Sequence, residues 1–140
     1  MYYDDEDKII DDILMNTKTI ALIGASVKEE RPSNSVMRNL LSRGYQVFPV
    51  NPAYAGGKIL GQECFSSVTN IPHEIDMVDV FRQSNAVPNI VKEAIKLQIK
   101  TIWLQLGIGH AEAEATAREH GIRVISNRCP NIEFRRKEFS

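Results

Sequence analysis

The feature that most constrains the fold is an alternation of short apolar runs with segments of helical periodicity. Five apolar runs have strand length, and most are followed by stretches whose apolar residues recur at three- and four-residue spacing. Parallel strands need a crossover connection, usually a helix. The pattern therefore predicts an α/β fold with a five-stranded parallel sheet, doubly wound, with helices on both faces. The expected strands are residues 19–23, 45–50, 77–81, 101–105 and 122–125.

The segments between these runs predict amphipathic helices. The first predicted helix carries acids in its first turn, which suit the dipole of a helix N-terminus, and Gly44 and Gly121 stand just past two others. Pro130 is suited to starting a last helical segment. The expected helices are residues 4–16, 33–43, 86–97 and 110–120.

Residues 53–75 are less regular than the rest. Residues 59–61 are predicted as a short edge strand, and residues 66–71 as a single helical turn before Pro72. The polar tail, residues 135–140, is expected to be frayed. A chain of 140 residues fits one domain, with residues 17–134 as its core.

Composition excludes several classes of partner. The 17 Lys and Arg residues nearly balance 18 Asp and Glu residues, so the markedly basic field of a general nucleic-acid binder is missing. No apolar stretch approaches the roughly 18 residues that cross a bilayer. Cys64 and Cys129 form no disulfide framework, and no basic-then-apolar leader opens the chain, so we expect a cytoplasmic protein.

An anion site is predicted where the first strand meets its helix. Residues 19–23 run into the turn Gly24-Ala25-Ser26, and a helix opens at Pro32 and Ser33. Glycine lets backbone N–H groups approach a ligand closely, and the helix N-terminus adds unpaired donors and partial positive charge. In doubly wound sheets, ligands bind outside the carboxyl ends of the strands, where the strand order reverses.

Cations cluster in the loops at that same edge. Lys28, Arg31, Lys58, Arg82 and Arg128 all follow predicted strands. A nearly neutral chain that gathers these side chains at one rim has a local positive field suited to a polyanion such as a nucleotide.

The glycine turn does not match the dinucleotide fingerprint G-x-G-x-x-G, because Ser26 stands where the second glycine would be. The second strand ends in Val50-Asn51 and lacks the carboxylate that commonly binds the NAD ribose. The main alternative function is an NAD(P)-dependent oxidoreductase or another nucleotide-dependent enzyme. The missing glycine and the missing carboxylate argue against it. An interaction domain without a small ligand also stays open.

Short motifs along the chain resemble one family. Residues 17–134 are similar to the stand-alone bacterial and archaeal CoA-binding proteins, which are Rossmann-type domains like the CoA-binding domain of the succinyl-CoA synthetase α-subunit. The motifs are G-A-S at 24–26, R-P-S at 31–33, G-Y-x-V-x-P-V-N-P at 44–52, V-D-V-F-R at 78–82, V-P-x-I-V-x-E-A-I at 87–95, W-L-Q at 103–105 and R-C-x-x-I-E at 128–133.

The resemblance implies coenzyme A or an acyl-CoA as the ligand, bound by a carrier, sensor or regulatory protein. It places the pyrophosphate on the Gly24 to Ser26 turn, and the adenosine near Asn51. The domain that carries the phosphorylated histidine of the synthetase is absent, so no catalytic residue is predicted, and a homodimer is compatible with the sequence. The expected ligand-binding residues are Gly24, Ala25, Ser26, Arg31, Pro32, Ser33, Asn51, Pro52, Lys58, Phe81, Arg82, Ser84, Val87, Gln105, Gly107 and Cys129.

Other reactive side chains support weaker hypotheses. Cys129, between Arg128 and a helix start, is a candidate for a mixed disulfide with the CoA thiol, against a packing role. Asp79 is a candidate for ligand contact or loop anchoring. His73, His110 and His120 have no metal-ligand spacing, so no metal is predicted. Trp103, Met77 and Phe48 are expected in the core.

Overall fold

The computed structural model describes residues 5–138, and its centre is a five-stranded sheet in which all neighbouring strands are parallel. The strand order is β2-β1-β5-β6-β7, so the order reverses between β1 and β5. This confirms the predicted α/β fold and places the reversal where a ligand crevice is expected. The strands are β1 (Thr19–Ile23), β2 (Gln46–Val50), β5 (Met77–Val80), β6 (Thr101–Leu104) and β7 (Arg123–Ile125).

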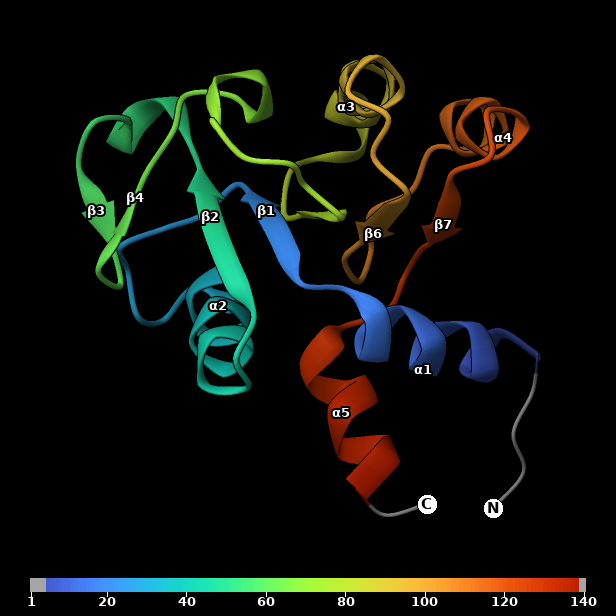
Figure 1. Cartoon of the computed structure of the whole chain (residues 1–140), viewed down its shortest axis with the longest axis horizontal. Coiled ribbons are helices and arrows are strands. Elements are labelled where there is room, and N and C mark those ends of the chain that lie inside the picture. The colour runs from blue at the N-terminus through green and yellow to red at the C-terminus, as the bar shows by residue number, and fades with distance from the viewer. Residues whose placement is uncertain (1–4, 139–140) are drawn as a thin grey trace.

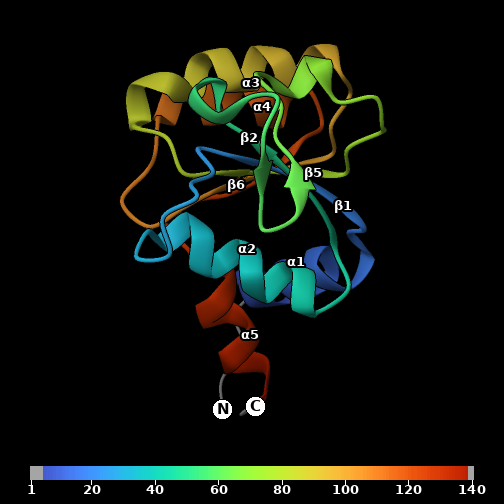
Figure 2. The ribbon, with the colours of Figure 1, turned by 90° about the vertical axis from the view of Figure 1, so that its left-hand side faces the viewer.

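Helices cover both faces of this sheet (Figures 1 and 2). One face carries α3 (Val87–Lys96) and α4 (Ala111–Glu119). The opposite face carries α1 (Asp5–Asn16), α2 (Pro32–Ser42) and α5 (Pro130–Glu138). The helices follow the predicted segments to within one or two residues at each end, which is the usual uncertainty of helix boundaries. No helix within residues 5–138 is long and apolar enough to cross a membrane.

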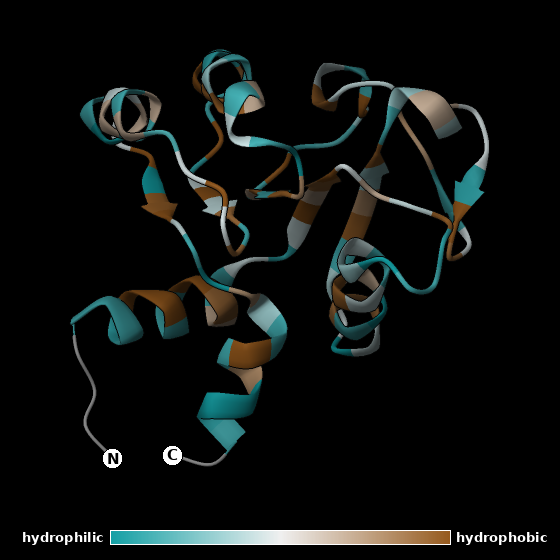
Figure 3. Ribbon diagram, turned by 180° about the vertical axis from the view of Figure 1, so that it is seen from behind, coloured by the Kyte–Doolittle hydropathy of each residue, from teal (hydrophilic) through white to brown (hydrophobic). Residues whose placement is uncertain are grey.

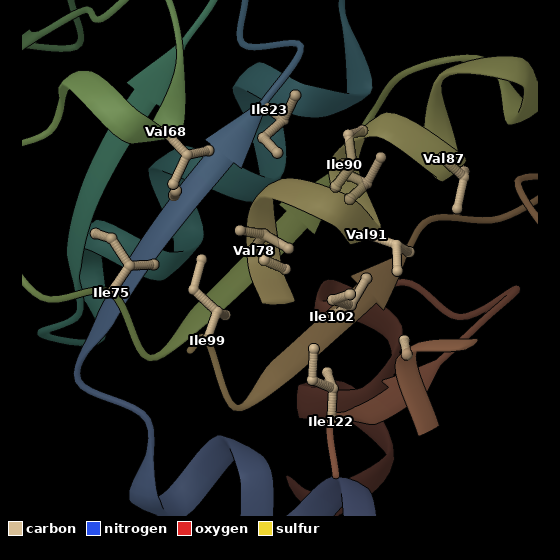
Figure 4. Packing of buried hydrophobic residues seen from close by; sticks show 14 of the residues in the cluster. Ile23, Val68, Ile75, Val78, Val87, Ile90, Val91, Ile99, Ile102 and Ile122 are labelled. Carbon is tan, nitrogen blue, oxygen red and sulfur yellow. The ribbon is translucent and has the colours of Figure 1, made fainter. Parts of the chain in front are cut away.

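Strand residues alternate between two apolar clusters, one on each face. Val78 and Ile102 pack toward α3 (Figure 4), whereas Met77 and Trp103 belong to the cluster that includes residues of α1 and α2. A parallel sheet buried on both faces needs apolar residues at nearly every position. Trp103 and Met77 are fully buried and Phe48 is 8% exposed, so their predicted core role is confirmed. In Figure 3 the strands are largely hydrophobic and the helices carry both colours.

The segment between β2 and β5 differs from the prediction. A two-stranded antiparallel hairpin of β3 (Lys58–Ile59) and β4 (Gln62–Glu63) forms a second, small sheet beside β2. The predicted edge strand over residues 59–61 is wrong, because Leu60 and Gly61 have φ angles of 50° and 79° and form the turn. Short 3₁₀ helices, η1 (Pro52–Tyr54) and η2 (Val68–Asn70), complete the segment, and η2 is the predicted single turn.

The C-terminal segment is ordered further than predicted. Residues 135–138 belong to α5, and only residues 139–140 of the expected frayed tail lie outside the described part. Arg136 bonds Asp11 of α1 at 2.8 Å and Glu133 of α5 at 2.9 Å. These carboxylates overcome the effect of burial and raise the pKa of Arg136. The ion pairs join α5 to α1, which no local pattern in the tail could indicate.

Candidate functional site

A cavity of about 520 Å³ opens at the carboxyl ends of the strands, beside the reversal of strand order. Its walls come from the turn after β1, the start of α2, and the loops after β2, β5 and β6. It is lined by Gly24, Ala25, Ser26, Lys28, Arg31, Pro32, Ser33, Asn51, Tyr54, Phe81, Arg82, Gln105, Leu106 and Ile108.

Gly24 allows two backbone segments to meet at the floor of this cavity. Its φ angle is +89°, and a Cβ atom placed there would lie 2.7 Å from the Phe81 carbonyl oxygen. The amides of Gly24 and Ala25 both donate to the Val50 carbonyl, at 2.9 and 3.3 Å. The turn therefore packs directly against the ends of β2 and β5, and no other residue fits at its first position.

Substitution of Gly24 by alanine tests this packing. We expect Gly24→Ala to lower the free energy of unfolding by about 1–3 kcal/mol more than Gly44→Ala, measured by chemical denaturation. Gly44 is the matched control because its φ angle is +94° and nothing lies within 4 Å of an added Cβ. Equal losses for the two variants would show that the Phe81 carbonyl imposes no steric limit.

The N-terminus of α2 faces the cavity without a side-chain cap. Arg31 is the N-cap residue, with extended backbone angles of −77° and 137°, and Pro32 begins the helix. Ser33 is buried, lines the cavity, and has an amide that lies too early in the helix for an intrahelical partner. An uncapped helix start of this kind favours an anion.

Two asparagines hold the turn and the helix together. Asn34, 2% exposed, donates from Nδ2 to the Ser26 carbonyl at 2.9 Å. Asn51 donates from Nδ2 to the Ala25 carbonyl, also at 2.9 Å, and its Oδ1 accepts from the Ala53 amide. Asn51 was predicted as a ligand contact, whereas Asn34 was not, because its position inside a helix gives no signal of this role.

Three cationic residues line the cavity: Lys28, Arg31 and Arg82. None of the described residues that line the cavity is acidic. All three are exposed at the mouth. The predicted rim of five cations is thus wrong at two positions. Lys58 lies on the β3 hairpin outside the lining, and Arg128, also outside the lining, pairs with carboxylates of α1 and α5.

Arg128 is neutralised by carboxylates. Its guanidinium lies 3.1 Å from Asp7 and 3.2 Å from both Glu6 and Glu133. Burial alone would lower the pKa of Arg128, but Asp7, Glu133 and Glu6 raise it overall. The acids at the start of α1, explained from the sequence by the helix dipole alone, therefore also pair with this arginine. Asp4 of that cluster lies outside the described residues.

The structure brings most of the expected ligand-binding residues together, and leaves the following outside the lining: Pro52, Lys58, Ser84, Val87, Gly107 and Cys129. Val87 is fully buried in the core, and Cys129 packs against the cluster under α2. Tyr54, Leu106 and Ile108 line the cavity and were missed, although each follows a strand whose carboxyl end was identified.

Two buried polar side chains lack partners among the described residues. Gln105 is 6% exposed, lines the cavity, and has an unbonded Oε1 atom. Asp79 is fully buried in β5, in register with Leu22 and Trp103, and neither of its carboxyl oxygens has a hydrogen-bond partner. Burial raises the pKa of Asp79 to about 8. Asp79 lies outside the cavity lining.

The histidines have structural contacts. His110 caps α4 by accepting from the Ala113 amide, and His73 stacks on Phe48 with centroids 5.0 Å apart. Residues 5–138 contain no group of three or more His, Cys, Asp or Glu that could hold a metal ion.

A doubly wound parallel sheet with an uncapped helix start and a positive cavity at its switch point defines the nucleotide-binding class of α/β proteins. Within that class, residues 18–135 match the family described as CoA binding domain. The chain therefore belongs to this family.

Relatives include both stand-alone proteins and parts of larger enzymes. An uncharacterized protein, YneT, of Bacillus subtilis is 34% identical over 123 residues, which are 88% of this chain and 90% of YneT. Acetate–CoA ligase [ADP-forming] I subunit alpha of Pyrococcus furiosus is 31% identical over 85% of this chain, but the match spans only 28% of that subunit. A solved structure of a hypothetical protein from Pyrococcus horikoshii superposes with a TM-score of 0.88 at 42% identity, covering 93% of this chain and 90% of the other.

Proposed function

We propose that this protein binds coenzyme A or an acyl-CoA in the cavity at the carboxyl edge of the sheet. The observation that carries the proposal is the positive cavity built on the Gly24 turn and the uncapped start of α2. A diphosphate accepts hydrogen bonds and carries negative charge, so it fits the backbone donors at the uncapped start of α2, flanked by Arg31 and Lys28. The family membership supports CoA as the nucleotide.

The strand order suggests how the two halves of the ligand would lie. With the diphosphate between β1 and α2, the ligand extends one way toward β2 and the other way toward β5 and β6. We propose the adenosine half beside Asn51 and Tyr54, and the pantetheine half beside Phe81, Gln105 and the loop that follows β6. Arg82 lines the same cavity and would add positive charge near the phosphates.

We propose a carrier, sensor or regulatory role, performed by one domain with residues 17–134 as its core. The P. furiosus relative is an acetate–CoA ligase subunit of which this chain matches only 28%, so acetate–CoA ligase activity does not follow. The absence of acidic lining residues among those described supports a polyphosphate ligand. Asn51 stands where NAD-dependent enzymes commonly place a carboxylate, and its side chain holds the Ala25 carbonyl, which argues against the alternative of an NAD(P)-dependent enzyme.

Isothermal titration calorimetry tests the proposal directly. The ligands are CoA, acetyl-CoA, adenosine 3′,5′-bisphosphate, NAD, NADP and ATP, each titrated into the purified protein. We expect CoA or acetyl-CoA to bind more tightly than NAD, NADP or ATP, because only CoA and acetyl-CoA combine the diphosphate with the pantetheine arm. Tighter binding of NAD or NADP, or heat from none of the six, would contradict the proposal.

A further inference from the structure

The loop after β6 forms the wall of the cavity farthest from β2. It turns tightly, because the Ile108 amide donates to the Gln105 carbonyl at 3.0 Å and Gly107 has a φ angle of 78°. This is the arrangement of a turn that places glycine at its third position. Leu106 and Ile108 present apolar side chains to the cavity on either side of that glycine.

Two side chains from flanking loops hold this wall. Oδ1 of Asn127, which follows β7, accepts from the Gly107 amide at 2.9 Å. Oγ of Ser84, which follows β5, accepts from the Gly109 amide at 3.1 Å. Asn127 has a φ angle of 58°, a conformation that asparagine adopts more readily than most residues. The loop is therefore tied on both sides to neighbouring strands of the sheet.

These bonds determine what the wall can offer a ligand. The amides of Gly107, Ile108 and Gly109 are all engaged within the protein, so they are not free to bind an anion as the α2 side can. The side chains of this wall offer apolar surface and the buried Oε1 acceptor of Gln105, which has no partner among the described residues. A buried acceptor without a partner is costly, and a ligand group that donates a hydrogen bond removes that cost. Phosphate cannot donate at neutral pH, whereas an amide N–H can.

We propose that Asn127 and Ser84 are positioning residues that fix the residues 105–109 wall in the shape that recognises a neutral, amide-bearing arm of the ligand. The proposal rests on the proposed function, since CoA carries such an arm beyond its diphosphate. Ser84, expected from the sequence to touch the ligand, acts through the loop instead. Discrimination between CoA and nucleotides without the arm then depends on residues that lie outside the cavity.

Two variants and two ligands test this proposal. Asn127→Gly removes the acceptor and keeps the backbone conformation accessible, and Ser84→Ala removes the other acceptor. CoA and adenosine 3′,5′-bisphosphate are each titrated into the unmodified protein and both variants. We expect each variant to weaken CoA binding about five- to tenfold, the effect of losing one hydrogen bond, with the affinity for the bisphosphate unchanged within about twofold.

Conservative variants provide the controls. Ser84→Thr and Asn127→Asp keep an oxygen acceptor and are expected to retain more of the CoA affinity than Ser84→Ala and Asn127→Gly. Unchanged CoA affinity in both acceptor-free variants would overturn the positioning role, as would an equal loss for both ligands, which indicates a general loss of structure. If the unmodified protein binds neither ligand, the proposed function itself fails.

Discussion

Replacement of Arg31 by glutamate is expected to abolish CoA binding, lowering the affinity about 100-fold or more. The substitution changes a cation to an anion at the N-cap of α2, beside the proposed diphosphate. Two charges about 4 Å apart interact by about 4 kcal/mol near a protein surface, so reversal of one charge exceeds the roughly 3 kcal/mol that 100-fold represents. The Arg31 side chain is exposed, so the fold is expected to persist. Calorimetric titration with CoA measures the loss.

Lys92→Glu is the matched control for this experiment. It makes the same charge change at an exposed position of α3, outside the cavity lining. We expect Lys92→Glu to bind CoA nearly as well as the unmodified protein, and both variants to unfold at similar denaturant concentrations. Full CoA affinity in Arg31→Glu would show that the anion site lies elsewhere on the molecule.

Replacement of Asp79 by leucine is expected to increase the free energy of unfolding, by an amount that depends on pH. Burial raises the pKa of Asp79 to about 8. The unfolded chain releases this proton near pH 3.9 while the folded chain retains it, so the stability of the unmodified protein falls between about pH 4 and pH 8. Between pH 4 and pH 8, the free energy of unfolding of the unmodified protein is expected to fall by on the order of 5 kcal/mol through this one group.

Urea denaturation at several pH values from 4 to 9 measures this effect. The free energy of unfolding of Asp79→Leu should exceed that of the unmodified protein by a margin that widens with pH and levels off above about pH 8. Every other ionisable group is common to both proteins, so the comparison isolates the carboxyl of Asp79. Asp79→Asn, which cannot ionise, should show the same pH dependence as Asp79→Leu. A constant difference across the range would mean that the Asp79 carboxyl titrates normally in the folded protein.

The sheet was predictable because its signals are local. Apolar runs of strand length, the glycines that end helices and the prolines that start them all lie within a few residues of the element that they define. Apart from the local hairpin turn at Leu60 and Gly61, the elements and rim cations that were predicted wrongly depend on contacts between distant segments. Arg128 follows β7 like a rim cation, but Asp7 lies 121 positions earlier and binds it. Arg136 orders the last turns of α5 through Asp11, 125 positions away.

The candidate site divides in the same way. The backbone of the Gly24 turn, the start of α2 and the strand ends were identified by position, because parallel strands bring their carboxyl ends to one edge. The side chains that line the cavity could not be identified by position. Ser84 and Val87 both lie within a few residues of Arg82, but Ser84 accepts from a loop amide and Val87 is buried in the core. A residue's position along a loop does not indicate the direction of its side chain.

The amino-acid sequence by itself determined the strands of the main sheet, most of the helices and the edge of the sheet where the candidate site lies, because hydrophobic periodicity and glycine placement act over a few residues. Only the tertiary structure decided which cations remain free at that edge, how Asn34 and Asn51 hold the turn, and that Asn127 and Ser84 support the opposite wall. Those outcomes depend on which segments far apart in the chain become neighbours, and burial and charge pairing are properties of the packed molecule.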